Sequence, residues 1–350
     1  MSAAPRRAGA RVAKAAAPVP AGADLNTRLG IGAATAGAPR ARDVLVCELG
    51  PRAGLQDLGG VMPTAAKIAW IDAAAAAGLA AIEVGAFAPA APRPQLADSA
   101  ELVAHARAIA GLTVAVRVFD RAGAAAALAG GAHKIVVALA VSESYGMRHG
   151  GRDQAQALAE LRGIGELVNA LPAPQRPHLE GSLCAAFGCP QEGAVSERRV
   201  LELAVALMEA GCHEIGLADS GGSANPAQVR RLIRGVWSAV GRHQLTSVAL
   251  SDARGLGLAN ALAALDVGLT GFDAVLGGLG SAAAGAALVT EDLVFMCEAM
   301  GLRTGVDLPA LLALREQLGR ALPGEPLRGM TALAGLPPGF VAASLRPPAP

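Results

Sequence analysis

From residue 44 onward, short runs of apolar residues alternate with longer segments in which apolar residues recur every three or four positions. The short runs are typical of strands buried on both faces, and the longer segments are typical of amphipathic helices. Glycines such as Gly78, Gly131 and Gly211 mark the ends of helical segments. The strands predicted in this way span 44–48, 81–85, 113–118, 134–138, 179–184, 214–218, 247–251 and 272–276.

The helical segments follow the strands one by one. Eight strands that each precede a helix, over roughly 250 residues, are the pattern of a (β/α)8 barrel. We therefore predict the α/β class and a TIM barrel with a disordered N-terminal extension and a short C-terminal helical tail. The predicted helices span 64–77, 99–110, 121–129, 152–170, 196–210, 226–240, 258–265, 288–300 and 307–321.

The two ends of the chain differ from the middle. Residues 1–42 are rich in Ala, Pro, Gly and Arg, and four basic residues precede the first acidic one, Asp24. This pattern loosely resembles a transit peptide, but the prolines and glycines favour a disordered basic extension. We predict that the barrel spans 43–306 and that 307–350 forms a C-terminal helix and a Pro/Gly-rich tail.

The amino-acid composition excludes some classes of binding partner. The formal net charge is +1 and aromatic residues make up 3% of the chain, which argues against a nucleic-acid partner. No run approaches the ~18 apolar residues of a membrane-spanning helix, so no membrane partner is expected. Five cysteines without regular spacing indicate a reducing compartment, and we predict a cytoplasmic protein.

One motif lies at the end of the first predicted strand. Gly50 and Pro51 stop the strand, so Arg52 lies where the strand opens into a loop. The run Gly-Pro-Arg-Ala-Gly-Leu-Gln at 50–56 resembles the Gly-Pro-Arg-Asp-Gly-Leu-Gln signature of hydroxymethylglutaryl-CoA lyases, with Ala53 in place of the metal-binding aspartate. Further segments resemble the same family, in order, at 81–87, 94–98, 188–193, 214–219, 278–280 and 290–293.

The resemblance implies a metal-dependent barrel lyase with a pyruvate carboxyltransferase-like domain. Such enzymes use Mg²⁺ or Mn²⁺ to polarise the substrate, and an arginine stabilises developing negative charge. The active site of a barrel lies at the C-terminal ends of its strands. The resemblance makes Arg52 the remnant of the catalytic oxyanion clamp. The substrate-binding residues predicted beside it are Gln56, Glu83, Ser142, Asp219, Asp252 and Arg254.

The departures from the family concern the metal. Two histidines that alternate on the seventh strand correspond here to Ala249 and Ser251, and the asparagine ligand corresponds to Ala287. With Ala53, all four expected ligand positions lack a metal-binding side chain of the family. The loop at 281–285 contains no cysteine, although the family places a catalytic thiol there. We therefore predict no metal cofactor and no metal-dependent cleavage, which makes the chain a pseudoenzyme candidate.

Three functions are open at this point. The chain is a degenerate lyase-like barrel that binds an acyl-CoA or a small organic acid; or an active carbon–carbon lyase or aldolase with a rebuilt site; or a structural subunit of an oligomer. We expect a homo-oligomer or a complex with an active homologue.

Individual residues also have more than one interpretation. Arg52 is either a retained clamp or a structural ion-pair partner of Glu83 or Asp219. Cys184 and Cys189, near the barrel mouth, are either small buried hydrophobic residues, which we favour, or partners of His149, in a predicted loop there, in a nucleophilic or replacement metal site. The glycines at 277–280 would offer backbone amides to a phosphate.

Arg254 follows the seventh strand, beside the emptied metal positions. Without a dication, Glu83, Asp219 and Asp252 would be left uncompensated in a partly desolvated mouth. Arg254 is then either a solvent-facing loop arginine, the interpretation that we favour, or, as our hypothesis, an inward-turned arginine that together with Arg52 replaces the charge of the metal.

Overall fold

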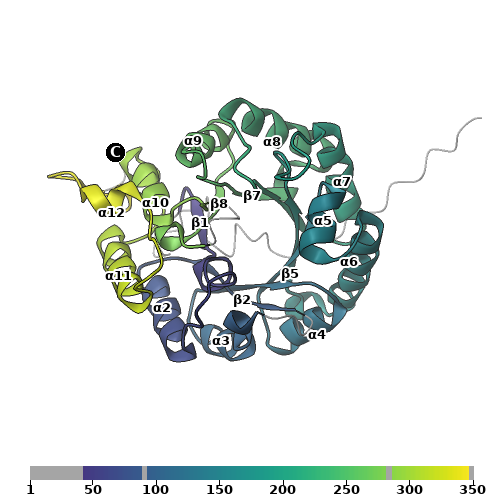
Figure 1. Ribbon diagram of the computed structural model, residues 1–350, viewed down its shortest axis with the longest axis horizontal. Helices are drawn as coiled ribbons and strands as arrows, with labels where there is room; N and C mark the ends of the chain where they lie inside the picture. Colours follow the sequence, from purple (N-terminus) through teal and green to yellow (C-terminus); the bar gives the residue numbers. More distant parts are fainter. Residues whose placement is uncertain (1–41, 89–92, 281–285, 347–350) are drawn as a thin grey trace, which may run out of the picture.

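The computed structural model describes residues 42–88, 93–280 and 286–346, and it confirms the predicted TIM barrel. Eight parallel strands close into a barrel in sequence order, with helices outside them (Figure 1). Residues 1–41, most of the predicted extension, lie outside the described residues. The strands are β1 (Leu45–Glu48), β2 (Ala81–Phe87), β3 (Thr113–Val118), β4 (Lys134–Ala140), β5 (His178–Cys184), β6 (Glu214–Ala218), β7 (Leu245–Ala249) and β8 (Gly271–Ala274).

Pairing between the first and last strands closes the barrel. Leu45 of β1 pairs with Gly271 of β8, and Glu48 pairs with Ala274. Predicted and observed strands agree to within two residues at each end. The largest shift is in β7, which ends at Ala249, because Ser251 beyond it forms an isolated bridge with Ala287.

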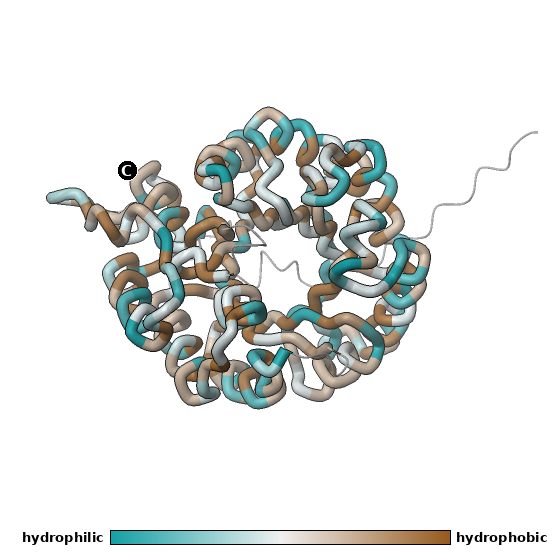
Figure 2. Tube along the Cα trace, viewed as in Figure 1, coloured by the Kyte–Doolittle hydropathy of each residue, from teal (hydrophilic) through white to brown (hydrophobic). Residues whose placement is uncertain are grey.

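The helices bury one face against the strands and expose the other. Figure 2 shows hydrophobic residues along the strands and polar residues on the outer helical turns. Side-chain caps start several helices, such as Asp153, which forms a capping box with Gln156. The helices are α2 (Thr64–Ala76), α3 (Ser99–Ala106), α4 (Arg121–Ala129), α5 (Glu143–Gly150), α6 (Gln154–Asn169), α7 (Glu197–Glu209), α8 (Pro226–Val240), α9 (Gly257–Val267), α10 (Thr290–Ala299), α11 (Leu308–Ala321) and α12 (Met330–Ala334).

Two short elements at the C-terminal ends of the strands were not predicted. The motif after β1 is a single π-helical turn, η1 (Gly50–Gly54), instead of an open loop. A methyl group at Gly50 would overlap Glu48 and Trp70, so only glycine fits there. The helix α5 lies between β4 and α6, and it covers one side of the barrel mouth (Figure 1).

Polar contacts hold the C-terminal segment against the barrel. The carboxylate of Asp292 in α10 accepts hydrogen bonds from the backbone N–H groups of Met330 and Thr331, at 2.8 and 2.7 Å. Buried Glu298 accepts bonds from the backbone and hydroxyl of Ser344. No helix in the described ranges is long and apolar enough to span a bilayer.

Candidate active site at the barrel mouth

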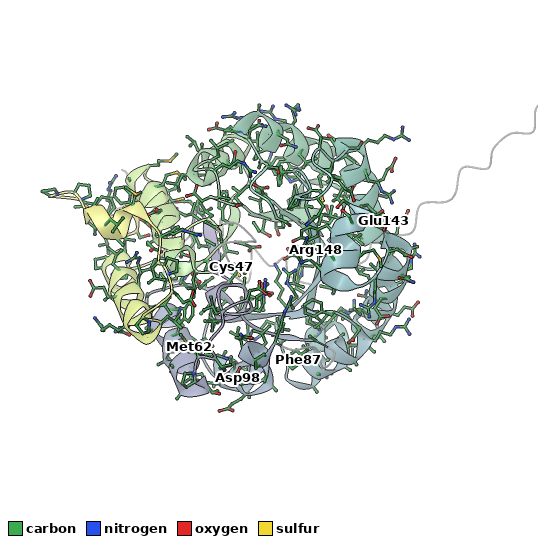
Figure 3. The ribbon with its side chains drawn as sticks, viewed as in Figure 1. Cys47, Met62, Phe87, Asp98, Glu143 and Arg148 are labelled. Carbon is green, nitrogen blue, oxygen red and sulfur yellow. The ribbon has the colours of Figure 1, made fainter. Side chains whose placement is uncertain are left out.

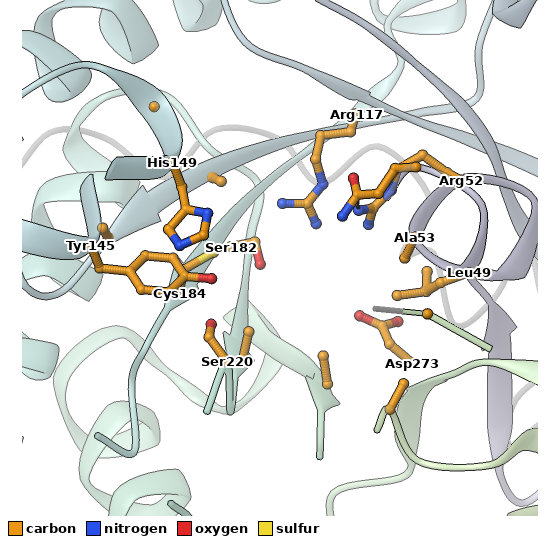
Figure 4. Close-up of a pocket in the computed structure, with 18 of the residues that line it drawn as sticks. Leu49, Arg52, Ala53, Arg117, Tyr145, His149, Ser182, Cys184, Ser220 and Asp273 are labelled. Atoms are coloured by element: carbon orange, nitrogen blue, oxygen red, sulfur yellow. Dashed lines mark hydrogen bonds between the residues drawn. The ribbon is translucent and has the colours of Figure 1, made fainter. Parts of the chain in front are cut away.

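A cavity of about 310 Å³ opens at the C-terminal ends of the strands. Its lining comes from all around the barrel, including η1, β3, α5, β5 and β8 (Figure 4). Figure 3 places Cys47 of β1 near the barrel axis and Met62 and Asp98 in the outer layer, beside α2 and α3. The cavity is therefore the site where side chains from strands far apart in the sequence meet.

A buried cluster of two arginines and one carboxylate forms one wall of this cavity. Glu83 of β2 accepts bonds from Arg52 Nε at 2.9 Å and Arg52 Nη2 at 2.7 Å, and from Arg117 Nε at 3.2 Å. Side-chain exposure is 7% for Arg52, 1% for Glu83 and 15% for Arg117. Burial acts to raise the pKa of Glu83, but the two guanidinium groups outweigh it and lower the pKa. We call Arg52, Glu83 and Arg117 the mouth cluster; it carries a surplus of one positive charge.

The terminal nitrogens of the two arginines differ in their partners. Arg52 Nη1 donates to Gln56 Oε1 at 3.3 Å, so all three of its nitrogens are engaged. Arg117 uses only Nε for its bond to Glu83. Figure 4 shows the Arg117 guanidinium pointing into the cavity, with Ser182 and Asp273 also facing it.

Asp273 of β8 is the carboxyl group that faces the cavity from the strand pairing with both β1 and β7. Burial, reinforced by the nearby charge of Glu180, raises its pKa to about 7. The group therefore changes protonation near neutral pH.

Three predicted site residues serve the loops of the mouth. Asp219 accepts bonds from the backbone N–H groups of Ser223 and Ala224, at 2.8 and 3.2 Å. Asp252 accepts a bond from Gly257 N at 2.8 Å, at the start of α9. Ser142 accepts a bond from Tyr145 N at the start of α5 and donates to Cys189 Sγ at 2.9 Å.

The structure places Arg254 in ion-pair contact with none of the described acids, as the solvent-facing interpretation predicts, although its charge acts to lower the pKa of Asp219, which burial raises. Its guanidinium is on the exposed rim, where Nη1 donates to the carbonyl oxygens of Gly221 and Gly222 at 2.6 and 2.7 Å. The loop after β6 lies directly beside the guanidinium of Arg254, so backbone carbonyl oxygens of that loop bind it instead of the carboxylates. The second cation at Glu83 is Arg117.

The geometry of the mouth supports neither a Cys–His pair nor a phosphate-binding glycine loop. His149 is on α5 instead of a loop, and its ring stacks on Tyr145 with centroids 4.2 Å apart. His149 and Cys184 line the same cavity, but within the described residues no hydrogen bond joins the His149 ring to the thiol of Cys184 or Cys189. In the glycine run, Gly277 N donates to Glu291 Oε2 and Gly278 N to Val275 O, so these amides are not available to a phosphate.

Comparison with known proteins places this geometry in a family. A family model described as HMGL-like matches residues 43–318. The chain belongs to the hydroxymethylglutaryl-CoA lyase-like family. A hydroxymethylglutaryl-CoA lyase of Bacillus subtilis is 32% identical over 298 residues, which cover 83% of this chain and 98% of the relative. The mitochondrial enzyme of Gallus gallus is 35% identical, over 77% of this chain and 90% of its own.

Solved structures of the lyase family agree with the fold. A lyase from Acinetobacter baumannii, in complex with coenzyme A and 3-methylmalate, superposes with a TM-score of 0.79 at 34% identity, covering 85% of this chain and 97% of that one. The enzyme from Pseudomonas aeruginosa gives 0.77 at 32% identity, with 83% and 96% covered. The carboxyl transferase domain of Rhizobium etli pyruvate carboxylase, at 17% identity and a TM-score of 0.62, shares the fold.

The side chains at the four positions where the sequence comparison led us to expect metal ligands do not fit a divalent cation. Ala53, Ala249, Ser251 and Ala287 all line the cavity. The hydroxyl of Ser251 donates to the carbonyl oxygen of Ala286 at 2.9 Å and accepts a bond from Ala253 N at 3.2 Å, and the three alanines offer no ligand atom in their side chains. In the part of the chain that the structure describes, no group of three or more His, Cys, Asp or Glu residues could hold a metal ion. The loop at 281–285, where the family thiol is expected, lies outside the described residues.

The sequence places Arg117 at the C-terminal end of its strand without assigning it a role, and it gave no indication of Ser182 or Asp273. Arg117 and Asp273 each follow a buried apolar residue and precede another, as in Val-Arg-Val of β3, whereas Ser182 lies in a strand that also contains His178 and Glu180. A single charged residue inside a buried strand of a barrel was the available signal, because such a residue must face the interior or the mouth.

Proposed function

We propose that this chain binds a small organic acid or its coenzyme A thioester at the barrel mouth and does not catalyse metal-dependent carbon–carbon cleavage. One observation carries the proposal: the four positions of the family's metal ligands, Ala53, Ala249, Ser251 and Ala287, line one cavity together without a ligand set. Alanine and a hydroxyl that donates elsewhere supply no first shell for Mg²⁺ or Mn²⁺.

Loss of the metal removes the Lewis acid from the reaction. Polarisation of the substrate by a divalent ion contributes several kcal/mol of transition-state stabilisation. The segment at 281–285 also lacks the thiol that the family resemblance assigns as the acid. Loss of one such group commonly reduces the rate by about 10²–10⁴-fold, so turnover should fall below detection when both are absent.

The positively charged wall of the cavity supports retained binding of an anionic ligand. The mouth cluster keeps a surplus positive charge beside a cavity of about 310 Å³, and a buried cation favours an anionic ligand. The related Acinetobacter baumannii lyase is described in complex with coenzyme A and 3-methylmalate. A hydroxy-dicarboxylate of this kind is the ligand class that we assign to the cavity.

The test combines metal binding, turnover and ligand binding. We expect no stoichiometric Mn²⁺ site in calorimetry and no acetoacetate from hydroxymethylglutaryl-CoA with saturating Mg²⁺ or Mn²⁺, while coenzyme A or acetyl-CoA raises the melting temperature. The variant Ala53→Asp/Ala249→His/Ser251→His/Ala287→Asn should gain metal binding without turnover, because the thiol is still missing. Robust wild-type turnover would instead support an active lyase with a rebuilt site. If neither coenzyme A nor acetyl-CoA changes the melting temperature, a structural subunit would be supported.

The expected homo-oligomer or complex with an active homologue, and the cytoplasmic location, remain predictions. Light scattering of the purified protein, alone and co-expressed with a homologue that has the complete ligand set, checks the assembly. Cell fractionation checks the location.

A further inference from the structure

We propose that Arg117 forms a metal-free binding site for a carboxylate, with Asp273 and Ser182 opposite it to bind a hydroxyl group of the same ligand. The inference rests on the proposed function and specifies how this chain would hold the acid without a cation. It assigns the recognition of the ligand to residues that replace the metal with direct hydrogen bonds.

The two arginines of the mouth cluster use different numbers of their N–H donors. Glu83 has two oxygens, and both are occupied by the fork of Arg52. Arg117 reaches the same carboxylate with Nε alone, so Nη1 and Nη2 make no hydrogen bond to a described residue. A guanidinium presents two parallel N–H donors with the geometry of a carboxylate. Arg117 therefore offers an unused fork, whereas Arg52 does not.

The charges of the mouth cluster do not balance. Two guanidinium groups share one carboxylate, and all three side chains are at least 85% buried, since the most exposed of them, Arg117, is 15% exposed. A buried cation without a full counter-charge is costly, and an incoming anion removes that cost. The ligand class follows from this balance: when Asp273, the acid that also lines the cavity, is protonated, one carboxylate neutralises the cluster.

Two polar side chains face Arg117 across the cavity. Asp273 and Ser182 line the same cavity, and neither side chain makes a hydrogen bond to another described residue. Small apolar side chains surround them, among them Ala53, Ala249 and Ala287. A short acid with a hydroxyl group near its carboxylate would satisfy the fork of Arg117 at one end and these two side chains at the other.

The experiment measures binding calorimetrically with three probes in buffer containing EDTA. L-malate has the carboxylate and the hydroxyl, succinate lacks the hydroxyl, and dimethyl succinate lacks both charges. We expect malate to bind more tightly than succinate, the diester not to bind, and EDTA to change nothing. Equal binding of the diester, or loss of malate binding in EDTA, would overturn the proposal.

Two variants and a matched control locate the site. Arg117→Leu should weaken malate and succinate at least tenfold, because a charge-assisted bidentate contact is lost. Asp273→Ala should weaken malate severalfold while leaving succinate within twofold. Arg162→Leu removes an exposed arginine of α6 with the same change in net charge, and binding should stay within twofold of wild type. Malate affinity of Arg117→Leu equal to wild type contradicts the proposal.

A crystal structure of the wild type with malate keeps the test independent of the folding of the variants. A malate carboxylate within hydrogen-bond distance of Arg117 Nη1 and Nη2 supports the site, and a carboxylate bound elsewhere in the cavity overturns it. Failure of the proposed function gives a different result. Metal-dependent turnover of hydroxymethylglutaryl-CoA would refute that proposal, whatever the affinity of Arg117→Leu for malate.

Discussion

Two buried ion clusters occupy opposite ends of the same barrel, and they carry opposite net charges. The mouth cluster has two cations and one acid. At the N-terminal ends of the strands, Lys134 contacts both Glu180, at 2.5 Å, and Glu214, and Glu214 also contacts His178 at 3.1 Å. We call Lys134, Glu180 and Glu214 the base cluster; it has one cation and two acids.

The clusters differ in what completes them. The base cluster does not line the cavity, and protein groups surround it: Thr246 donates to Glu214 Oε2 at 2.6 Å, and a methyl group at Gly216 would overlap Glu180. The mouth cluster leaves the fork of Arg117 facing the cavity. A buried ion cluster whose hydrogen-bonding groups are all bonded to the protein stabilises one arrangement of the strands. A cluster with unused donors at a cavity is able to bind a ligand. This difference predicts how each cluster responds when its central ion is removed.

The largest effect is expected for Lys134→Met. The variant leaves Glu180 and Glu214 side by side without a cation, which costs about 3–5 kcal/mol of unfolding free energy. Lys134, with His178, holds the pKa of Glu214 well below its usual range despite burial. This contribution is present above the unfolded pKa and is lost as the pH falls through the folded one. The deficit measured by urea unfolding should therefore shrink at acid pH, and Arg162→Met serves as the surface control.

Glu83→Gln makes the corresponding change at the mouth, and its effect should be smaller. Two guanidinium groups lose their carboxylate, but Arg117 also faces the water of the cavity, so we expect a loss of about 1–3 kcal/mol. The surplus charge rises from one to two, and added succinate should raise the melting temperature of the variant more than that of wild type. Glu166→Gln on the exposed face of α6 is the control. A loss as large as that of Lys134→Met would mean that the hydrogen-bonding groups of both clusters are all bonded to the protein.

Asp273→Asn tests the acid between the two clusters through pH. Its folded pKa, about 7, lies above the usual value of 3.8, because burial disfavours the charged carboxyl. Stability due to the protonated form is complete below the unfolded pKa and is lost as the pH rises through 7. Asparagine stays neutral, so relative to wild type the variant should gain about 3 kcal/mol between pH 5 and pH 8. Parallel pH profiles of the two proteins would contradict the assignment.

The barrel could be predicted because its signal repeats. Each strand is a short apolar run between helices with marked ends, and β3 and β6 are observed as predicted. The short helix α5 was missed because none of its residues is buried, so Glu143–Gly150 has no apolar stripe that periodicity could reveal. The π-helical turn η1 was missed because Pro51 indicates only the end of a strand.

The site was predictable where one residue decides and not where partners compete. That Ala53, Ala249, Ser251 and Ala287 stand in place of metal ligands is still a prediction from the sequence, to which the structure adds that all four residues line one cavity. The choice of the second cation at Glu83 depended on distance. Arg117 is on the strand paired with that of Glu83, whereas Arg254 is on a loop whose nearest acceptors are backbone carbonyls.

The smallest effect is therefore expected for Arg254→Ala. The guanidinium donates to the carbonyl oxygens of Gly221 and Gly222 on the exposed rim, and Asp219 holds the same loop through Ser223 and Ala224. Water replaces exposed hydrogen bonds at little cost, so the loss should be about 0.5 kcal/mol.

Neither a permanently charged arginine nor a backbone carbonyl titrates near neutral pH, and the charge of Arg254 is the smallest of the influences given for the pKa of Asp219, so this loss should be nearly the same at pH 5, 6.5 and 8. Urea unfolding at these three values, with Arg162→Ala as the surface control, provides the measurement. If instead the variant lost 1–3 kcal/mol at pH 8 and less at pH 5, Arg254 would compensate Asp219 and Asp252 electrostatically. The surplus positive charge of the mouth cluster would then extend to the rim. Two arginines, Arg117 and Arg254, would then distinguish the mouth cluster from the base cluster, instead of Arg117 alone.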